Sequence, residues 1–279
     1  MALQISAPLH GRVHSSPLFS VNSLPLHAMG ESTSPLVMLD DFRVSGRPFP
    51  PHPHAGFSAV TYVWEDSATG LRSVDSLGHD VQVGPGGIVW TQAGRGVLHQ
   101  EAPAVSGREL LGVQFFVNLS SAHKLSAPQT LWLDAAQVPV WSDDEGNSVR
   151  VVVGTHGGQA SSLQPVEPFT LLDVDLHSQL ELEVRPPQRG LVYARSGHVR
   201  VATPGAATLL EPGQAAAVRG SGKLHLTVAS RARVLYLEGA AIHEPVVSHG
   251  PFIMNTRAQL ADAIGRYETG QMGQLAPLL

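Results

Sequence analysis

Short runs of β-branched and aromatic residues recur along the chain, and turn-forming residues separate them. Residues 58–64 (SAVTYVW) and 112–119 (GVQFFVNL) are two such runs, and residues 180–185 (LELEVR) alternate apolar and charged side chains. That alternation is typical of a strand with one buried face. The 279 residues include 28 Gly and 21 Pro, which suits many short strands joined by turns and does not suit a helical bundle. The sequence predicts an all-β antiparallel sandwich or barrel.

The two ends of the chain differ from this pattern. Residues 1–35 are rich in Ser, Pro and Gly without a clear period, so we expect an extended or loosely ordered segment that adds an edge strand. Residues 256–269 predict a helix, because Thr256 and Gln259 form a capping-box pattern and Gly270 is placed to end it. Three further side chains fall on one helical face: Leu260, Ile264 and Tyr267.

Charge and composition exclude several classes of function. Lys and Arg number 18 against 23 Asp and Glu, a net charge of −5, so we expect no direct binding of nucleic acid through bulk charge. The chain contains no Cys, which excludes disulfides, thiolate nucleophiles and Cys-ligated metals. No signal-peptide pattern opens the sequence and no long apolar run crosses it. We therefore expect a soluble cytoplasmic protein with no membrane association.

A weak internal repeat divides the chain. The strings VTYVWED, VGPGG and VLHQE in the first half resemble LVYARSG, LEPGQ and KLHLT in the second. This length of strand-rich repeat indicates a duplicated β domain. We expect an N-terminal barrel over residues 1–130 and a C-terminal barrel with the helix over residues 131–279. The string SSAHKLSAPQ, which starts at residue 120, is expected to be part of the linker.

Two histidine-containing pairs flank predicted strands. His52 and His54 lie on either side of Pro53, and His99 and Glu101 end the next Gly-rich segment. Residues i and i+2 of an extended chain project to one side, so each pair offers two ligands to one point. Three imidazoles and a carboxylate suit one Fe(II), Mn(II), Ni(II), Cu(II) or Zn(II) ion. The alternative is structural, with a Pro-rich turn and a solvated strand end.

Other common catalytic motifs are missing from the sequence. Residues 84–87 (GPGG) and 94–96 (GRG) predict tight turns between strands. Neither contains the Lys and Ser/Thr of a phosphate-binding loop, and neither opens a helix, which argues against nucleotide binding. No G-x-S-x-G elbow is present, so a serine hydrolase has no support.

Three strings resemble the pirin family of the cupin superfamily: HPHAGFSAVTYV, VGPGGIVWTQAGRGVLHQE and EPVVSHGPFIMNT. The similarity runs in order from about residue 36 to residue 273. The resemblance implies a bicupin, with two stacked antiparallel, jelly-roll-like β-barrels and a short C-terminal helix. It also implies one mononuclear metal in the N-terminal barrel, usually iron, held by four ligands: His52, His54, His99 and Glu101. Phe252 and Met254 of the last string are expected in the core.

The sequence departs from the family pattern at a few positions. Ala55 stands where the family commonly has Arg, Ser58 where it has Glu, and Gln92 where it has Met. The first two changes remove charges expected near the site entrance, which affects substrate or partner preference and not metal binding. In the second barrel His225 occupies the expected loop without an H-x-H partner, and His177 and Glu181 are its nearest substitutes, so no second metal is expected.

The resemblance leaves two classes of function open. Some relatives resemble quercetin 2,3-dioxygenases, which would give a small flavonol-like aromatic substrate, O2 as co-substrate and Glu101 as the catalytic proton acceptor. Other relatives are regulatory proteins whose metal state controls binding to a transcription factor or a metabolic enzyme. A third reading is a structural metal such as zinc that only stabilises the barrel. We expect a monomer in each case.

Overall fold

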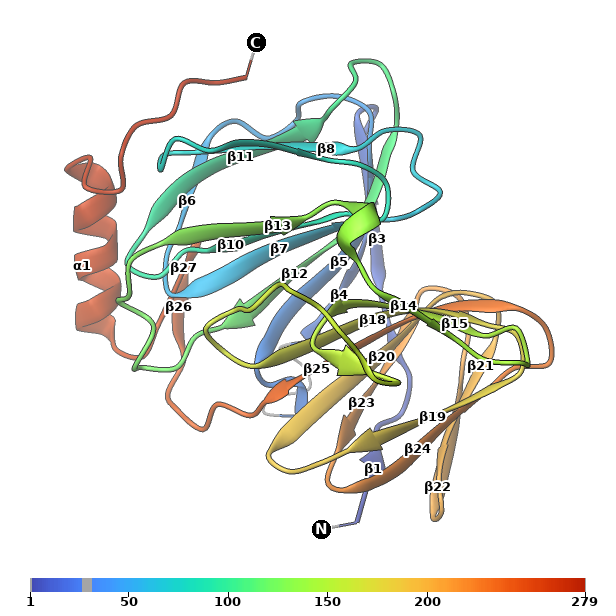
Figure 1. Cartoon of the computed structure of the whole chain (residues 1–279). Helices are drawn as coiled ribbons and strands as arrows, with labels where there is room; N and C mark the ends of the chain where they lie inside the picture. Colours follow the sequence, from blue (N-terminus) through green and yellow to red (C-terminus); the bar gives the residue numbers. More distant parts are fainter. Residues whose placement is uncertain (1, 27–31, 279) are drawn as a thin grey trace. The chain divides into compact units, whose positions relative to one another are not determined.

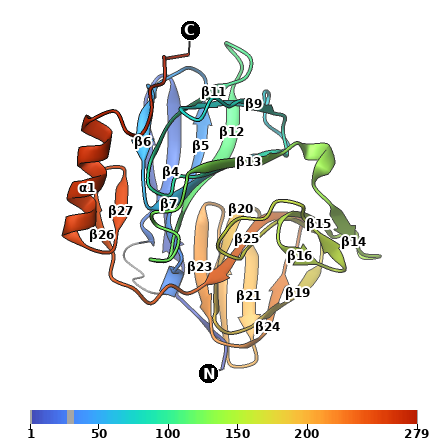
Figure 2. The same cartoon turned by 60° about the vertical axis from the view of Figure 1, so that its left-hand side comes forward.

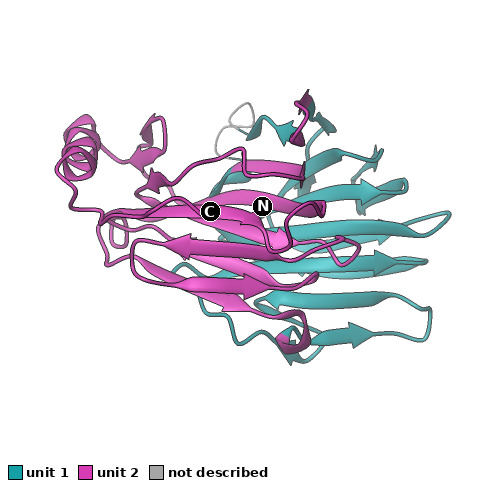
Figure 3. Ribbon diagram, turned by 90° about the horizontal axis from the view of Figure 1, so that it is seen from above, with its two compact units in different colours: residues 1–12, 22–37, 138–241 teal, residues 13–21, 38–137, 242–279 magenta. Residues whose placement is uncertain are grey.

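The computed structural model describes residues 2–26 and 32–278, and antiparallel strands dominate it (Figure 1). Two compact units alternate along the chain. Unit 1 comprises residues 1–12, 22–37 and 138–241, and unit 2 comprises residues 13–21, 38–137 and 242–279 (Figure 3). The contiguous division at residue 130 stays a prediction. No helix among the described residues is long and apolar enough to cross a membrane.

Unit 2 is built on a seven-stranded and a four-stranded sheet (Figures 1 and 2). The larger has the order β13 (Gln129–Leu133), β10 (Ile88–Gln92), β7 (Phe57–Val63), β12 (Leu110–Asn118), β5 (Leu36–Val44), β4 (Phe19–Leu24) and β3 (Arg12–Ser15). The smaller has the order β6 (His52–His54), β11 (Val97–Pro103), β8 (Leu71–Asp75) and β9 (Asp80–Val83). The predicted run at 58–64 forms β7, which is buried along its whole length, as expected of a central strand.

Unit 1 repeats this plan. Its larger sheet has the order β1 (Gln4–Ile5), β23 (Gln214–Arg219), β20 (Gln188–Ser196), β25 (Ala232–Ala240), β18 (Phe169–Leu176), β15 (Ser148–Val153) and β14 (Val140–Ser142), and β2 (Leu9–His10) also pairs with β23. Its smaller sheet has the order β19 (Gln179–Val184), β24 (Gly222–Thr227), β21 (Val199–Thr203) and β22 (Ala206–Leu210). Residues of β19 are alternately exposed and buried, so the period of two is confirmed. The strands β16 (Thr155–His156) and β17 (Gln159–Ala160) form a separate two-stranded sheet.

The repeat seen in the sequence is confirmed by strand order. In unit 2 the central strand β7 lies between β10 and β12, and in unit 1 the central strand β20 lies between β23 and β25. The smaller sheets β6-β11-β8-β9 and β19-β24-β21-β22 correspond strand for strand. The chain therefore carries the same arrangement of strands twice, and β6 and β11 of unit 2 correspond to β19 and β24 of unit 1.

The predictions for the chain ends are largely confirmed. The N-terminal segment supplies β1 and β3 at the ends of their sheets, while residues 1 and 27–31 of that segment lie outside the described residues. Helix α1 (Arg257–Glu268) begins after Thr256, which forms the capping box with Gln259. It lies beside β26 (Val247–His249) and β27 (Phe252–Met254) in unit 2 (Figure 2).

The helix and the linker each differ from expectation in one respect. Ala263 is the buried residue of α1, and Tyr267 is 43% exposed, so the packed face is centred one turn before Tyr267. The expected linker is ordered structure. Residues 129–133 form β13 on the edge of the larger sheet of unit 2, and Thr130 donates a 2.7 Å hydrogen bond to the buried Asp75. Strand β13 begins at Gln129, the last residue of the string SSAHKLSAPQ, and its pairing partners are distant in sequence.

Candidate metal centre and its cavity

Strands β6 and β11 bring three histidines together in unit 2. The two strands pair antiparallel, with His52 opposite His99 and His54 opposite Val97. Since alternate residues of a strand share a side, His52 and His54 face together and Pro53 faces away. The potential ligand nitrogens of His52, His54 and His99 all lie within 4.8 Å of one another. Among the residues that the structure describes, no other group of three or more His, Asp or Glu is gathered in this way.

The backbone next to the cluster orients one of the rings. Nδ1 of His52 lies 2.9 Å from the carbonyl oxygen of Pro50. That oxygen accepts a hydrogen bond from Nδ1, so the lone pair of the ring is on Nε2. The Nε2 atom of His52 lies 3.2 Å from Nε2 of His99. Two ring nitrogens that approach each other so closely are arranged to share one cation or one proton.

Burial keeps the inner imidazoles neutral. Loss of solvent, followed by the neighbouring His52, lowers the pKa of His54 to about 3, and the Pro251 carbonyl opposes this only in part. Burial, followed by His54 and His52, holds the pKa of His99 well below its usual range. Neutral imidazole is the form that binds a metal ion. These two histidines therefore need no deprotonation before they ligate.

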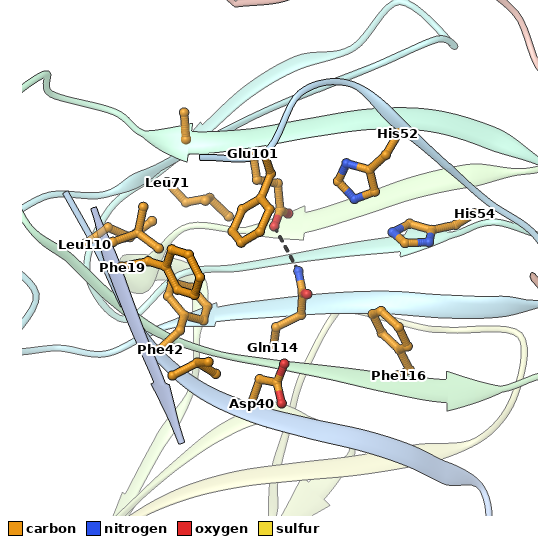
Figure 4. A pocket seen from close by; sticks show the side chains of 14 residues that line it. Phe19, Asp40, Phe42, His52, His54, Leu71, Glu101, Leu110, Gln114 and Phe116 are labelled. Carbon is orange, nitrogen blue, oxygen red and sulfur yellow. Dashed lines mark hydrogen bonds between the residues drawn. The ribbon is translucent and has the colours of Figure 1, made fainter. Parts of the chain in front are cut away.

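Glu101 lines the same cavity, but its hydrogen-bond partners are side chains outside the histidine cluster. Its Oε2 accepts a 2.7 Å hydrogen bond from the Thr61 hydroxyl and a 3.3 Å hydrogen bond from the Gln114 amide (Figure 4). Burial raises the pKa of Glu101 to about 7, although both hydrogen bonds favour the charged form. The structure thus gathers the three histidines closely and places the carboxylate beside them, with two polar residues that hold it.

Sequence reasoning did not find Thr61 and Gln114. Both lie within the apolar runs that form β7 and β12, where they read as ordinary strand residues. Their opposition in the register, with Thr61 beside Gln114, is what aims both at Glu101. The available signal was an uncharged polar residue at an otherwise apolar central position, which is informative when buried.

A cavity of about 260 Å³ opens from the histidines. His52 and His54 lie at one end, Phe19, Phe42 and Leu110 at the other, and Glu101 with Gln114 between them (Figure 4). The lining is mostly apolar, with four phenylalanine rings: Phe19, Phe42, Phe49 and Phe116. Ala55 and Ser58 are buried and do not belong to this lining. The expectation that they lie at the site entrance is therefore wrong, because Ala55 packs with Phe252, Met254 and the helix instead.

The loop after β6 is held by two unusual residues. Gly56 has φ +85°, and a Cβ there would overlap the carbonyl oxygen of Ile253, so only glycine fits. The ammonium group of the fully buried Lys124 donates hydrogen bonds to the Gly56 carbonyl at 2.9 Å, the Asn118 amide oxygen at 2.6 Å and the Ile253 carbonyl at 3.1 Å. These contacts fix the strand end that carries His54. Phe252 and Met254 are buried beside it, which confirms them as core residues.

The corresponding strands of unit 1 carry no such cluster among the residues described. His225 lies opposite Glu181 in the β19–β24 register, with 3.7 Å between Nδ1 and Oε2, and both side chains are more than 40% exposed. His177 instead approaches Asp175, at 3.4 Å. His225 and its two expected substitutes, His177 and Glu181, therefore do not converge on one point.

The residues of the histidine cluster fit a bound metal ion. Nδ1 and Nε2 of His54 and Nδ1 of His99 are buried, and among the described residues none of them has a hydrogen-bond partner of ordinary geometry. Unpaired buried polar atoms are costly, and a metal ion is one of the few groups that satisfies several at once. Neutral nitrogen donors together with a carboxylate suit a divalent transition metal.

Fold and site together define a bicupin with a histidine cluster in one barrel. The family model for Pirin matches residues 19–117, and the model for the Pirin C-terminal cupin domain matches residues 171–273. Pirin of Rattus norvegicus is 34% identical over 247 residues, which cover 86% of this chain and 82% of that protein. The chain belongs to the pirin family of the cupin superfamily.

Two further relatives are named for an enzyme activity. A Pseudomonas aeruginosa protein provisionally named quercetin 2,3-dioxygenase is 34% identical over 262 residues, covering 86% of this chain and 87% of that protein. The crystal structure of quercetin 2,3-dioxygenase from Acinetobacter baumannii has a TM-score of 0.87 and 25% identity, covering 99% of this chain and all of that chain. The bicupin fold predicted from the resemblance is confirmed.

Proposed function

We propose that this chain is an iron-dependent dioxygenase of the quercetin 2,3-dioxygenase type, with His52, His54, His99 and Glu101 as the metal ligands. Its overall reaction would convert a flavonol and O2 into a ring-opened aryl ester and carbon monoxide. The names of the Pseudomonas and Acinetobacter relatives support this assignment. The regulatory alternative is the outcome that remains if no turnover is found.

One observation carries the proposal: the histidine cluster faces a cavity lined mostly by apolar side chains. His52 and His54 are both part of the cavity lining, and so is Glu101. A structural zinc site is closed by its protein ligands, whereas a catalytic site keeps room for a substrate beside the ion. The cavity therefore favours a reactive centre over a metal that only stabilises the barrel.

The side chains around the cavity have separate roles in this proposal. Bound iron would supply Lewis-acid and redox chemistry at the histidine end. Glu101 accepts the proton of the flavonol 3-hydroxyl group, because a carboxylate ligand can release the metal and take up that proton. Thr61 and Gln114 donate hydrogen bonds to Glu101 and so orient its carboxylate. The phenylalanine rings pack against the aromatic substrate and exclude water.

Oxygen uptake with quercetin tests the proposal. Protein loaded with Fe(II) is expected to consume O2 and release carbon monoxide in equal amounts, and His54→Ala is expected to lose both together with the metal. Glu101→Gln is expected to lose more turnover than metal, because it removes the proton acceptor while keeping an oxygen donor. His225→Ala serves as the matched control and keeps both. Absence of uptake by protein shown to hold one iron per chain would refute the enzymatic assignment in favour of the regulatory one.

A further inference from the structure

We infer that Phe19 and Phe49 form a specificity element at the cavity mouth, which holds the 2-aryl ring of a flavonol-like substrate. The two rings are paired, with centroids 5.6 Å apart and planes inclined by 50°. Both line the cavity. The inference rests on the proposed function, because it names the part of the substrate that the same site recognises.

The size of the cavity favours a contact at its mouth. Its volume of about 260 Å³ lies below the range of about 300–1,000 Å³ that is usual for pockets enclosing a drug-sized ligand. A three-ring flavonol whose oxygen atoms reach the histidines would therefore extend out of the enclosed part. The 2-aryl ring, which a single bond joins to the bicyclic chromone, is the part that projects when the 3-hydroxyl and 4-keto oxygens reach the histidines.

The positions of the two rings match that portion of the substrate. Phe19 lies at the end of the cavity away from His52 and His54 (Figure 4). Phe49 is 47% exposed although it lines the cavity, which places it where the cavity meets solvent. An aromatic ring that is left this exposed offers apolar area for a ligand to cover, and aromatic pairs prefer tilted or offset contacts of the kind a third ring can join.

The backbone under both rings is anchored, so the pair is formed before a ligand binds. The Gln100 amide donates a 2.9 Å hydrogen bond to the Phe49 carbonyl and accepts a 2.7 Å hydrogen bond from the Leu278 amide. Gln100 lies between His99 and Glu101 in β11, which links the position of Phe49 to the ligand strand. On the other side, the Ser45 amide donates a 2.9 Å hydrogen bond to the carbonyl of Leu18, next to Phe19. Preorganised contacts of this kind improve affinity.

A pair of ligands separates recognition of the aryl ring from recognition of the chelating group. Quercetin and 3-hydroxychromone share the 3-hydroxy-4-keto group, and only quercetin carries the 2-aryl ring. Each is titrated without oxygen into metal-loaded protein by calorimetry, and metal content is measured in parallel. We expect Phe49→Ala and Phe19→Ala to weaken quercetin binding about tenfold while the affinity for 3-hydroxychromone and the metal content stay unchanged.

Two further variants serve as controls. Phe49→Tyr keeps the ring and is expected to retain quercetin affinity, and Leu77→Ala removes an exposed apolar side chain outside the cavity lining and is expected to change neither affinity. The inference is overturned if both ligands weaken equally, if neither weakens, or if wild-type protein binds no quercetin. Quercetin binding that depends on Phe49, without oxygen uptake by the iron-loaded protein, would keep the inference and reject the proposed activity.

Discussion

The two barrels use corresponding strands in opposite ways. In unit 2 the alternate positions of β6 and β11 that face the interior carry His52, His54, His99 and Glu101, and the positions between them carry Pro53, Leu98 and Gln100. In unit 1 the interior positions of β19 and β24 carry four buried leucines: Leu180, Leu182, Leu224 and Leu226. There the polar residues Glu181 and His225 occupy the outward positions.

The comparison teaches that parity along the strand decides whether a histidine faces the barrel interior or the solvent. Because side chains alternate, a His placed one position out of phase faces solvent, as His225 does. The leucines of unit 1 close its interior into a continuous apolar core. The histidines of unit 2 leave a cavity next to them, which gives room for a ligand.

The largest expected effect comes from giving unit 2 the interior of unit 1. His54→Leu is expected to weaken metal binding by more than about 100-fold, since loss of a mere orienting partner already costs about 10–100-fold. The barrel should remain folded, because leucine replaces a buried imidazole whose nitrogens have no hydrogen-bond partner of ordinary geometry among the described residues. Metal content after dialysis and circular dichroism measure the two outcomes.

The matched control replaces a histidine by leucine at an outward-facing strand position of unit 1. His225→Leu is expected to leave metal stoichiometry unchanged, because His225 faces outward beside Glu181. Full metal occupancy in a His54→Leu, His99→Leu double variant would contradict the ligand assignment. A loss of metal in His225→Leu would show that unit 1 contributes to metal binding.

The second effect tests the closed interior of unit 1. Leu224 is fully buried in its core, and Leu224→Ala is expected to lower the free energy of unfolding by about 2–5 kcal/mol through lost burial and an unfilled cavity. Urea denaturation followed by fluorescence measures this change. Leu209→Ala is the control, because Leu209 is 56% exposed and its truncation should cost less than about 0.5 kcal/mol. Equal effects for the two variants would argue against a packed interior.

A third, smaller effect concerns the carboxylate of unit 2. The Thr61 hydroxyl lowers the pKa of Glu101 against the larger effect of burial, so Thr61→Val should raise that pKa further. In the metal-free protein the unprotonated form then becomes scarcer between about pH 6 and pH 8, and a pH titration of the carboxylate by infrared spectroscopy measures the shift. Thr91→Val on the neighbouring strand β10 is the control, because the buried Thr91 hydroxyl has no partner among the described residues. An unchanged titration in Thr61→Val would show that the Thr61 hydroxyl does not act on the Glu101 carboxylate.

Much of the fold could be predicted because its signals are local. The alternation in LELEVR, the capping box at Thr256 and the turn glycines each depend on neighbours a few residues apart. Strand β13 is not predicted by the sequence, because its partners, β10 and Asp75, lie about 40 and 55 residues earlier in the chain. The pairing of distant segments leaves no local pattern.

Local patterns also decide which residues of the site could be predicted. His52, His54, His99 and Glu101 were found because H-x-H and H-x-E are short patterns with a chemical meaning. The structure brings the three histidines together. It places the Glu101 carboxylate in hydrogen bonds with Thr61 and Gln114, so the role of Glu101 as a fourth ligand stays a prediction. Phe19 belongs to no motif. It lies in the N-terminal segment that the sequence predicts to be loosely ordered, and nothing in that segment indicates that its ring lines a cavity.

The smallest effect contrasts Glu101 with Glu238 of unit 1, another carboxyl whose pKa is raised by burial. Burial raises the pKa of Glu238 in unit 1 to about 7, and no histidine cluster accompanies it among the described residues. In the unfolded chain the same group ionises near pH 4.3. As pH rises from about 4.3 to about 7, the unfolded chain loses its proton first, so the free energy of unfolding falls across this window.

Glu238→Gln removes this dependence, because glutamine does not ionise. We expect its stability to exceed that of the wild type by about 1–2 kcal/mol near pH 8, after allowance for solvent screening, and to match it near pH 4. Urea denaturation at several pH values measures the difference, and Glu268→Gln on the exposed face of α1 should leave the wild-type pH profile intact. If Glu238→Gln keeps the wild-type slope, the carboxyl of unit 1 is ionised in the folded protein, and the raised pKa would be particular to Glu101 beside the histidines.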